Sequence, residues 1–394
     1  MFALIVCVLL PRFELTVAAG AREALLQGPS VLAPEPGREQ LVGEVSQAAE
    51  AFGIHPGMRM GEALARCPRL ALVPPDPVGV ADAWERVVAR LETVGAEVEA
   101  ERPGLACFAA GGLRRLHGGS LDGVVAATRA ALRRPARIGA GPSRFCALAA
   151  ASRARARRAD LVRGVEDLAG EPVTLLRLRE PTAALPEALE RFGIATLGEL
   201  AALPRAALAD RFGAAGLLAH DLAHGRDTPL VPRRPGERLE EMLELEESAS
   251  GAQLERALSL LVDRLLARRE RRGRTVRVAV LSAGLVEGGT WRERLVFREP
   301  LADAVRMRLA LGQRLSLLPA PAESLRLAVE HFGPPHAGGH ALFDDGAAQR
   351  RARLREAIRQ ARAAAGPEAA LRVLAVDPDS RVPERRAVLT PFEL

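Results

Sequence analysis

The sequence contains no lysine, no tyrosine and no asparagine, and aromatic residues make up only 3% of its 394 residues. All 55 basic residues are therefore arginine, against 49 acidic ones, which gives a formal net charge of +6. A chain without lysine has no Walker-type, Schiff-base or kinase-type lysine, because a permanently charged guanidinium replaces neither an amine nucleophile nor a base. We interpret the arginine excess as codon bias, so by itself it does not indicate nucleic-acid binding.

Cysteines and long apolar runs are also scarce. The four cysteines, Cys7, Cys67, Cys107 and Cys146, never stand in a CxxC spacing. This pattern argues against a zinc ribbon and a disulfide framework, and indicates buried thiols in a reducing, cytoplasmic compartment. The apolar residues 1–10 are too short to cross a bilayer and have no basic leader, so we predict a buried strand there and no membrane association.

Hydrophobic patterning predicts an α+β, multidomain protein, and 48% hydrophobic residues suffice for several cores. In the first part, the apolar run 105–110 resembles a buried strand, and residues 81–94 carry apolar side chains at helical spacing. The second part consists of short helices broken by glycine and proline, and the third reads strand, helix, strand, strand, helix, strand. We divide the chain into residues 1–165, 166–235, 236–335 and a tail, 336–394.

A local repeat marks the second part, where LERFG at 189–193 is echoed by ADRFG at 209–213. Short helices with glycine at the turn predict paired helix-hairpin-helix units. We expect a helix to begin after Thr196 and free backbone N–H groups in the turn, which would bind phosphate without reading sequence. The candidate DNA-binding residues of this turn are Gly193, Ile194 and Thr196.

In the third part, residues 254–266 predict a helix with one apolar face. Two strands then follow. In the first, Val276, Val278 and Val280 alternate with Arg277 and Ala279. In the second, Trp291, Glu293, Leu295 and Phe297 alternate with Arg292, Arg294, Val296 and Arg298, so we expect a sheet with a basic outer face. A dense basic run precedes the first strand, and a solvated helix end explains it equally well. The candidate DNA-binding residues here are Arg271, Arg272, Arg274, Arg277, Arg292 and Arg294.

Four stretches together resemble Y-family translesion DNA polymerases: FGIHPGMRMGEA at 52–63, CPRL at 67–70, RIGAGPSR at 137–144 and FGIATLGEL at 192–200. The resemblance covers roughly residues 1–335. It implies a UmuC-like palm and fingers, a helix-hairpin-helix thumb, and a little-finger DNA-binding domain, followed by a C-terminal interaction tail.

The same resemblance implies carboxylates on neighbouring palm strands that hold two divalent ions. The corresponding positions of this chain are neutral. Without carboxylates nothing offsets the repulsion between two cations, so we expect no catalytic residue, no metal and no cofactor. Glu97, Glu99 and Glu101 could form an acidic cluster, but we interpret them as a solvated or ion-paired edge. The expected ligand positions are Cys7, Leu9, Gly104 and Leu105.

The missing ligands and the C-terminal stretch make the sequence similar to the ImuB group of inactive Y-family homologues. That resemblance implies a noncatalytic DNA-binding adaptor in damage-induced (SOS) translesion synthesis and mutagenesis. Its partners would be primer-template DNA, a sliding clamp, a RecA-like companion and an error-prone C-family DNA polymerase. Leu342 and Phe343 are the clamp-binding candidates, although the usual glutamine is absent and a packed loop is the alternative.

Two other functions stay open from the sequence. One is an active Y-family translesion DNA polymerase that holds Mg²⁺ with displaced carboxylates. The other is a protein-interaction scaffold without DNA contact.

Overall fold

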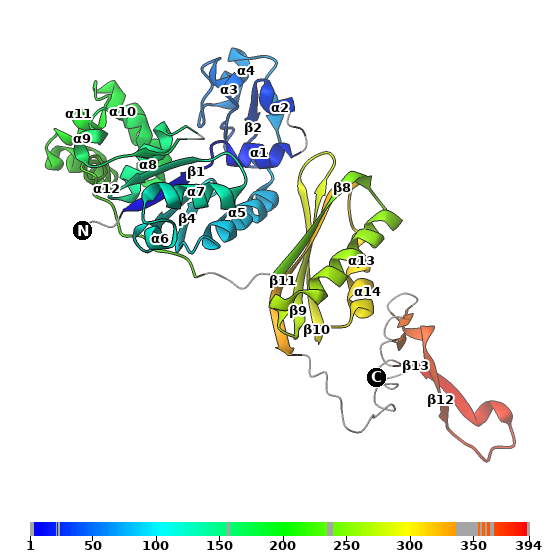
Figure 1. The fold of residues 1–394 in the computed structure, drawn as a ribbon. Coiled ribbons are helices and arrows are strands. Elements are labelled where there is room, and N and C mark those ends of the chain that lie inside the picture. Colours follow the sequence, from blue (N-terminus) through cyan, green and yellow to red (C-terminus); the bar gives the residue numbers. More distant parts are fainter. Residues whose placement is uncertain are drawn as a thin grey trace. The chain divides into compact units, whose positions relative to one another are not determined.

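The computed structural model describes residues 4–20, 22, 24–155, 158–234, 239–335, 354, 357–358, 361–362 and 366–391. These belong to two compact units, Met1–Pro334 and Pro335–Leu394. In the first unit, the five-stranded and the four-stranded sheet each pack against helices, which confirms the α+β class (Figure 1). Over the described ranges, no helix has both the length and the apolarity needed to cross a membrane.

The first part is built on a five-stranded sheet with the order β4-β5-β1-β6-β7. All five residues of β1 are buried, which confirms the predicted first strand and explains its continuous apolar run. The predicted strand at 105–110 is β5. The strands are β1 (Ile5–Leu9), β4 (Val98–Arg102), β5 (Leu105–Ala109), β6 (Arg137–Gly141) and β7 (Asp160–Leu161).

Helices cover both faces of this sheet (Figure 1). Val6, Val8 and Phe108 share a core with α5 (Pro77–Glu92) and α7 (Leu121–Leu132). The alternate residues of β1 and β5 form a second core with α8 (Arg144–Arg153) and with the helical region that follows. Helix α5 confirms the helix predicted at 81–94.

Glycine allows α8 to cross β6 closely. A Cβ added at Gly139 would lie 2.0 Å from the backbone nitrogen of Ala151 and 2.5 Å from the carbonyl oxygen of Ala147. No side chain fits such a gap, so Gly139 serves helix packing.

A smaller lobe is inserted between β1 and α5. It contains the parallel pair β2 and β3, and Val31, Ile54 and Met58 belong to its own core. The elements from β1 to α9 that were not named above are α1 (Phe13–Ala19), α2 (Ala24–Gln27), β2 (Ser30–Leu32), α3 (Gln47–Glu50), α4 (Met60–Arg66), β3 (Ala71–Val73), α6 (Gly111–Leu116) and α9 (Val165–Leu168).

The region after α9 contains the two predicted hairpins. The first joins α10 (Leu185–Arg191) to α11 (Leu197–Ala201), and the second is a kink within α12 (Arg205–Ala223). Gly193 has φ +77° and Gly213 has φ +58°, a conformation that favours glycine at both turns. The repeated FG dipeptide thus ends a helix twice, as the sequence predicts.

A four-stranded antiparallel sheet follows, with the order β10-β9-β11-β8. Helices α13 and α14 lie side by side on one of its faces (Figure 1), and they pack there on Leu281, Leu295 and Leu325. The order of elements confirms the predicted pattern: β8 (Leu239–Ala249), α13 (Ala252–Ala267), β9 (Arg274–Leu285), β10 (Thr290–Leu301), α14 (Ala304–Leu315) and β11 (Ala322–Pro335).

The predicted alternation of β9 is wrong in one respect. Val276 belongs to the core under the helices, but the next core residues of this strand are Ala279 and Leu281. The pairing of β9 with β10 shifts register between the pairs that contain Val276 and Val278, so the side-chain alternation reverses there. Val278 and Val280 are instead buried on the opposite face of the sheet.

The second unit contains a two-stranded antiparallel sheet, β12 (Leu371–Ala375) and β13 (Ala387–Pro391). The clamp candidates Leu342 and Phe343 lie outside the described residues.

Candidate functional site

The positions expected to hold metal lie in a hydrophobic core. Cys7, Leu9 and Leu105 are 0%, 9% and 0% exposed, and they share one apolar cluster with α8. Cys7 pairs across the strands with Cys107, which belongs to the same cluster. Burial, with a smaller contribution from Cys107, raises the pKa of the Cys7 thiol well above its ordinary value. A neutral thiol and two leucines provide none of the oxygen ligands that Mg²⁺ requires.

The fourth position, Gly104, lies in the turn between β4 and β5. Its φ is +84°, and an added Cβ would lie 3.0 Å from both the carbonyl oxygen of Leu10 and the Cβ of Phe13. The turn therefore favours glycine and leaves little room for a side chain. Nowhere in the described ranges do three His, Cys, Asp or Glu residues group in a way that could hold a metal ion. The residues at the expected positions do not fit Mg²⁺.

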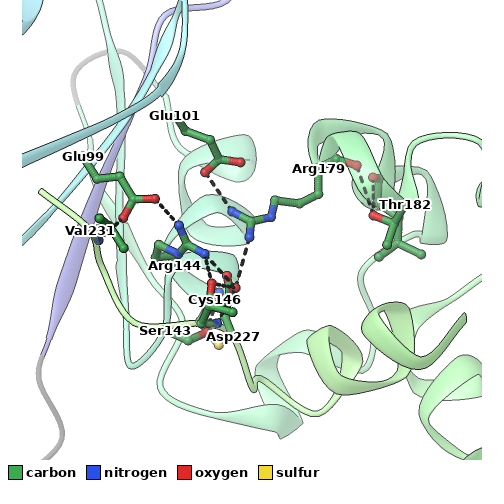
Figure 2. Close-up of polar contacts among 11 residues, drawn as sticks. Glu99, Glu101, Ser143, Arg144, Cys146, Arg179, Thr182, Asp227 and Val231 are labelled. Atoms are coloured by element: carbon green, nitrogen blue, oxygen red, sulfur yellow. Dashed lines mark hydrogen bonds and ion pairs between the residues drawn. The ribbon is translucent and has the colours of Figure 1, made fainter. Parts of the chain in front are cut away.

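Glu99 and Glu101 on β4 are ion-paired, as predicted, whereas Glu97 is exposed. Figure 2 shows two arginines pointing into this cluster from different elements. Arg144, the first residue of α8, pairs with Glu99, and Arg179 Nη1 donates to Glu101 Oε2 at 2.8 Å. Burial raises the pKa of Glu101, although both arginines oppose the shift.

Asp227 lies at the centre of this cluster (Figure 2). Its Oδ1 accepts from Arg144 at 3.1 Å and from Arg179 at 3.0 Å, and its side chain is 1% exposed. Burial by itself lowers the pKa of Arg144, but Asp227 and then Glu99 more than offset it, and the pKa is raised. We name these five side chains the buried ion cluster: Glu99, Glu101, Arg144, Arg179 and Asp227.

The ion cluster and its neighbours hold the segment 226–234 against the first sheet. The backbone N–H of Val231 donates to Glu99 Oε2 at 2.6 Å, and the N–H of Arg233 donates to the carbonyl oxygen of Val98 at 2.9 Å. Glu92 and Glu85 both accept from the Arg233 guanidinium, and they raise its pKa. Arg144, which follows the glycine-rich turn, therefore has a structural role in this conformation.

The expectation of free N–H groups in the first hairpin is wrong. Ala195 and Thr196 donate to Glu199 Oε2 at 2.7 and 3.0 Å, in a capping box that begins α11. The other turn amides, from Gly193 to Gly198, donate to carbonyl oxygens, and the N–H of Glu199 donates to the Thr196 hydroxyl. DNA binding by Gly193, Ile194 and Thr196 stays a prediction, but it does not rest on unsatisfied amides.

The sequence reasoning missed an aromatic and arginine pair between the hairpins. The guanidinium of Arg211 stacks over the ring of Phe192 at 4.0 Å, and Phe192 is 53% exposed. In the part of the chain that the structure describes, Arg211 forms no ion pair with a carboxylate. The repeated RFG motif could have indicated this pair, because Phe192 belongs to its first copy and Arg211 to its second.

The basic run before β9 is largely bound to backbone oxygens. Arg271 donates to Leu266 and Arg274, and Arg277 donates to the carbonyl oxygen of Arg298. Arg274 also stacks over Phe332 at 3.9 Å. Arg272 is exposed, with φ +50° and no carboxylate partner among the described residues. Bonds to carbonyl oxygens leave Arg271 and Arg277 without a carboxylate partner among the described residues.

The arginines on β10 lie apart from that run. Arg294 pairs with Glu330 at 2.8 Å, whereas Arg292 lies 3.7 Å from a carboxylate oxygen of Asp82 on α5. The open face of the sheet also carries Glu240 from β8, which receives a hydrogen bond from Arg326. The predicted basic face is therefore of mixed charge, with arginines along β10.

Comparison with known proteins finds a family similar to the first part of the chain. The sequence model of the IMS family, described as the impB/mucB/samB family, matches residues 9–152. Residues 9–152 of this chain are thus similar to the impB/mucB/samB family, in line with the Y-family resemblance of the sequence. DNA polymerase IV of Caulobacter vibrioides is 27% identical over 202 residues, and the match covers 50% of this chain and 50% of that protein. The chain therefore matches about half the length of this relative.

Solved structures with similar folds include DinB from Sulfolobus solfataricus, with a TM-score of 0.47 and 13% identity over 84% of this chain and 99% of that one. A Dbh ternary complex matches with a TM-score of 0.45 and 14% identity, over 83% of this chain and 98% of that one.

Proposed function

We propose that this protein is a noncatalytic, DNA-binding adaptor of translesion synthesis, related to the ImuB group. The observation that carries the proposal is the apolar core at the expected metal positions of a UmuC-like domain. Phosphoryl transfer by two metal ions requires a charged, oxygen-rich pocket, and Cys7, Leu9 and Leu105 are neutral and buried. The protein would then guide DNA and leave synthesis to a partner polymerase.

Several charges support the DNA-binding half of the proposal. Arg211 and Arg272 are exposed and have no carboxylate partner in the described ranges. Phosphates attract such unpaired arginines regardless of sequence, which suits a protein that must act at any lesion.

Primer extension tests the absence of catalysis. The purified full chain is mixed with primer-template DNA and nucleotides, first in Mg²⁺ and then in Mn²⁺, beside an active DNA polymerase IV. We expect no template-dependent extension by this chain. Extension that is lost on replacing a carboxylate, such as Glu101→Gln, would establish the alternative, an active translesion polymerase.

Binding to primer-template DNA separates the adaptor from a scaffold without DNA contact. We expect binding that weakens steeply with salt, because arginines release counterions from the phosphates they neutralise. Undetectable binding at low salt would favour the scaffold.

Arg211→Gln is expected to weaken DNA binding about threefold and to reduce the slope of log K against log salt by about one. The reason is that an uncompensated guanidinium held on the Phe192 ring is lost from the hairpins. Fluorescence anisotropy at several salt concentrations measures both effects. Arg115→Gln on α6 is the matched control, because it removes an exposed arginine far along the chain from the hairpins. Equal losses in both variants would contradict a specific role for Arg211.

The protein partners follow from the ImuB resemblance. A RecA-like companion and an error-prone C-family polymerase would join the adaptor, and a sliding clamp would bind through Leu342 and Phe343. Co-purification of wild type and of a Leu342→Ala, Phe343→Ala double variant with the clamp tests the last contact. Equal recovery of the clamp would exclude that segment as its binding site.

A further inference from the structure

The open face of the β8–β11 sheet makes a fitted contact with α5. Side chains on this face point away from α13 and α14, and α5 contributes acidic residues to meet them. The contact joins segments more than 200 residues apart in the chain. We name it the acidic clasp, formed by Asp76 and Asp82 on the side of α5 and by Thr290, Arg292 and Arg326 on the side of the sheet.

Asp82 is the main charged group of the clasp. One carboxylate oxygen accepts a hydrogen bond from Arg326, and the other lies 3.7 Å from Arg292 Nη1. The side chains of Asp82 and Arg326 are only 10% and 7% exposed. Arg326 is further held by Ser282 Oγ and by Glu240, each at 3.1 Å. A buried pair with such partners is screened little by salt.

The start of α5 forms the second contact. Asp76 caps the helix by accepting from the N–H of Gly79 at 2.9 Å, and its other oxygen accepts from the Thr290 hydroxyl at 2.8 Å. A Cβ at Gly79 would lie 2.5 Å from that hydroxyl oxygen. The helix and the strand therefore approach as closely as a glycine allows, which indicates a fitted interface.

The clasp occupies Arg292, one of the DNA-binding candidates of the sequence analysis. Arg292 lies on the strand assigned to phosphate binding, and it faces the Asp82 carboxylate. A phosphate oxygen and a carboxylate oxygen compete for the same guanidinium. The face cannot lie on α5 and on a duplex at the same time.

We propose that the acidic clasp holds this sheet in a DNA-excluding state, and that binding of duplex DNA requires the clasp to open. The inference rests on the proposed DNA-binding function and adds its regulation. If only an open fraction of the molecules binds, the apparent Kd equals the intrinsic Kd divided by that fraction. Weakening the clasp therefore tightens DNA binding.

Asp82→Asn in the full chain tests this, with a primer-template duplex as the probe. We expect the apparent Kd to fall about threefold to tenfold at moderate salt. Asp122→Asn on α7 is the control for the lost negative charge, because Asp122 is exposed and forms no ion pair among the described residues. Its Kd should stay within about twofold of wild type.

Thr290→Ala distinguishes the effect of opening the clasp from the effect of a changed net charge on DNA binding. It removes the hydrogen bond to Asp76 without changing the net charge, and we expect about a twofold tightening. If wild type binds DNA and neither Asp82→Asn nor Thr290→Ala binds more tightly, the clasp proposal is overturned.

Small-angle X-ray scattering gives a readout that does not depend on DNA. We expect a larger radius of gyration for Asp82→Asn than for wild type and Asp122→Asn, because the released sheet moves away from α5. If no form binds DNA, the proposed function fails, and scattering alone decides the clasp: an increase supports it and an unchanged radius overturns it.

Discussion

Cys7→Asp is expected to lower the free energy of unfolding by about 4 kcal/mol, even though it restores a carboxylate where the Y-family resemblance implies one. Cys7 is 0% exposed and packs among Leu9, Leu105 and Cys107. This apolar cluster contains no cation, and the Cys107 thiol is only a weak donor, so the new carboxylate loses its hydration without an adequate replacement.

The loss should also depend on pH. Burial raises the pKa of the present thiol, and the same burial would raise the pKa of an introduced carboxyl above its unfolded value. The penalty is therefore fully present above the folded-state pKa and decreases as pH falls through it. Urea denaturation at pH 7 and pH 5 measures the difference, and the loss should be smaller at pH 5.

Cys7→Ala provides the matched control, because it removes the sulfur without introducing charge. We expect it to cost about 1 kcal/mol through the small cavity that it leaves. If Cys7→Asp costs no more than Cys7→Ala, or if Mg²⁺ restores its stability, the pocket still accommodates a charged metal ligand. Either result would favour the active polymerase.

Arg144→Gln is expected to cost about 3–5 kcal/mol, because it leaves buried carboxylates without their cation. Its side chain is 8% exposed, and it pairs with Glu99 and with Asp227, which is 1% exposed. One oxygen of Asp227 already has no hydrogen-bond partner, so loss of the Arg144 guanidinium leaves this buried carboxylate still less satisfied. Urea denaturation measures the loss.

A second readout follows from the position of this cluster on the segment 226–234. Once Asp227 loses its bond to Arg144, and Glu99, which holds Val231, loses its cation, trypsin should cleave faster within this segment, which contains Arg226 and Arg233. Arg38→Gln is the control, because Arg38 is 77% exposed and its pair with Glu35 should contribute almost nothing. Equal stability of Arg144→Gln and Arg38→Gln would contradict a structural role for the cluster.

A double-mutant cycle completes the test. Combining Arg144→Gln with Asp227→Asn should cost less than the sum of the two single losses, because each change removes the same contact. Strict additivity would show that the two side chains do not interact in solution.

Arg144 illustrates a limit of the sequence reasoning. Arg144 ends the stretch RIGAGPSR at 137–144, and the sequence around it does not indicate which side chains it contacts. Its partners Asp227 and Thr228 follow more than 80 residues later, in a stretch that periodicity describes only as a connection. The buried ion cluster therefore could not be derived, although the pairing of Glu99 and Glu101 could be anticipated from their alternation on a strand edge.

In the hairpins, by contrast, most of the structure could be predicted from the local sequence. The repeated RFG motif fixes both turns, since a glycine at positive φ ends a helix in each copy. The Thr196 cap and the start of α11 also follow from local sequence. The hydrogen bonds of the Leu197 and Gly198 amides did not, because their acceptors, the carbonyl oxygens of residues 171 and 169, are brought to the turn only by the tertiary fold.

By itself, the sequence determined the α+β class, the order of elements around the four-stranded sheet, the hairpins and the absence of acidic residues at the expected metal positions. Those features depend on composition and on periods of two and 3.6 residues, which are local. Only the tertiary structure decided that Cys7 faces Cys107 in an apolar core, that β9 reverses its alternation, and that Asp82 meets Arg326. Such contacts depend on how distant elements pack, and hydrophobic patterning does not specify which polar side chains meet when they do.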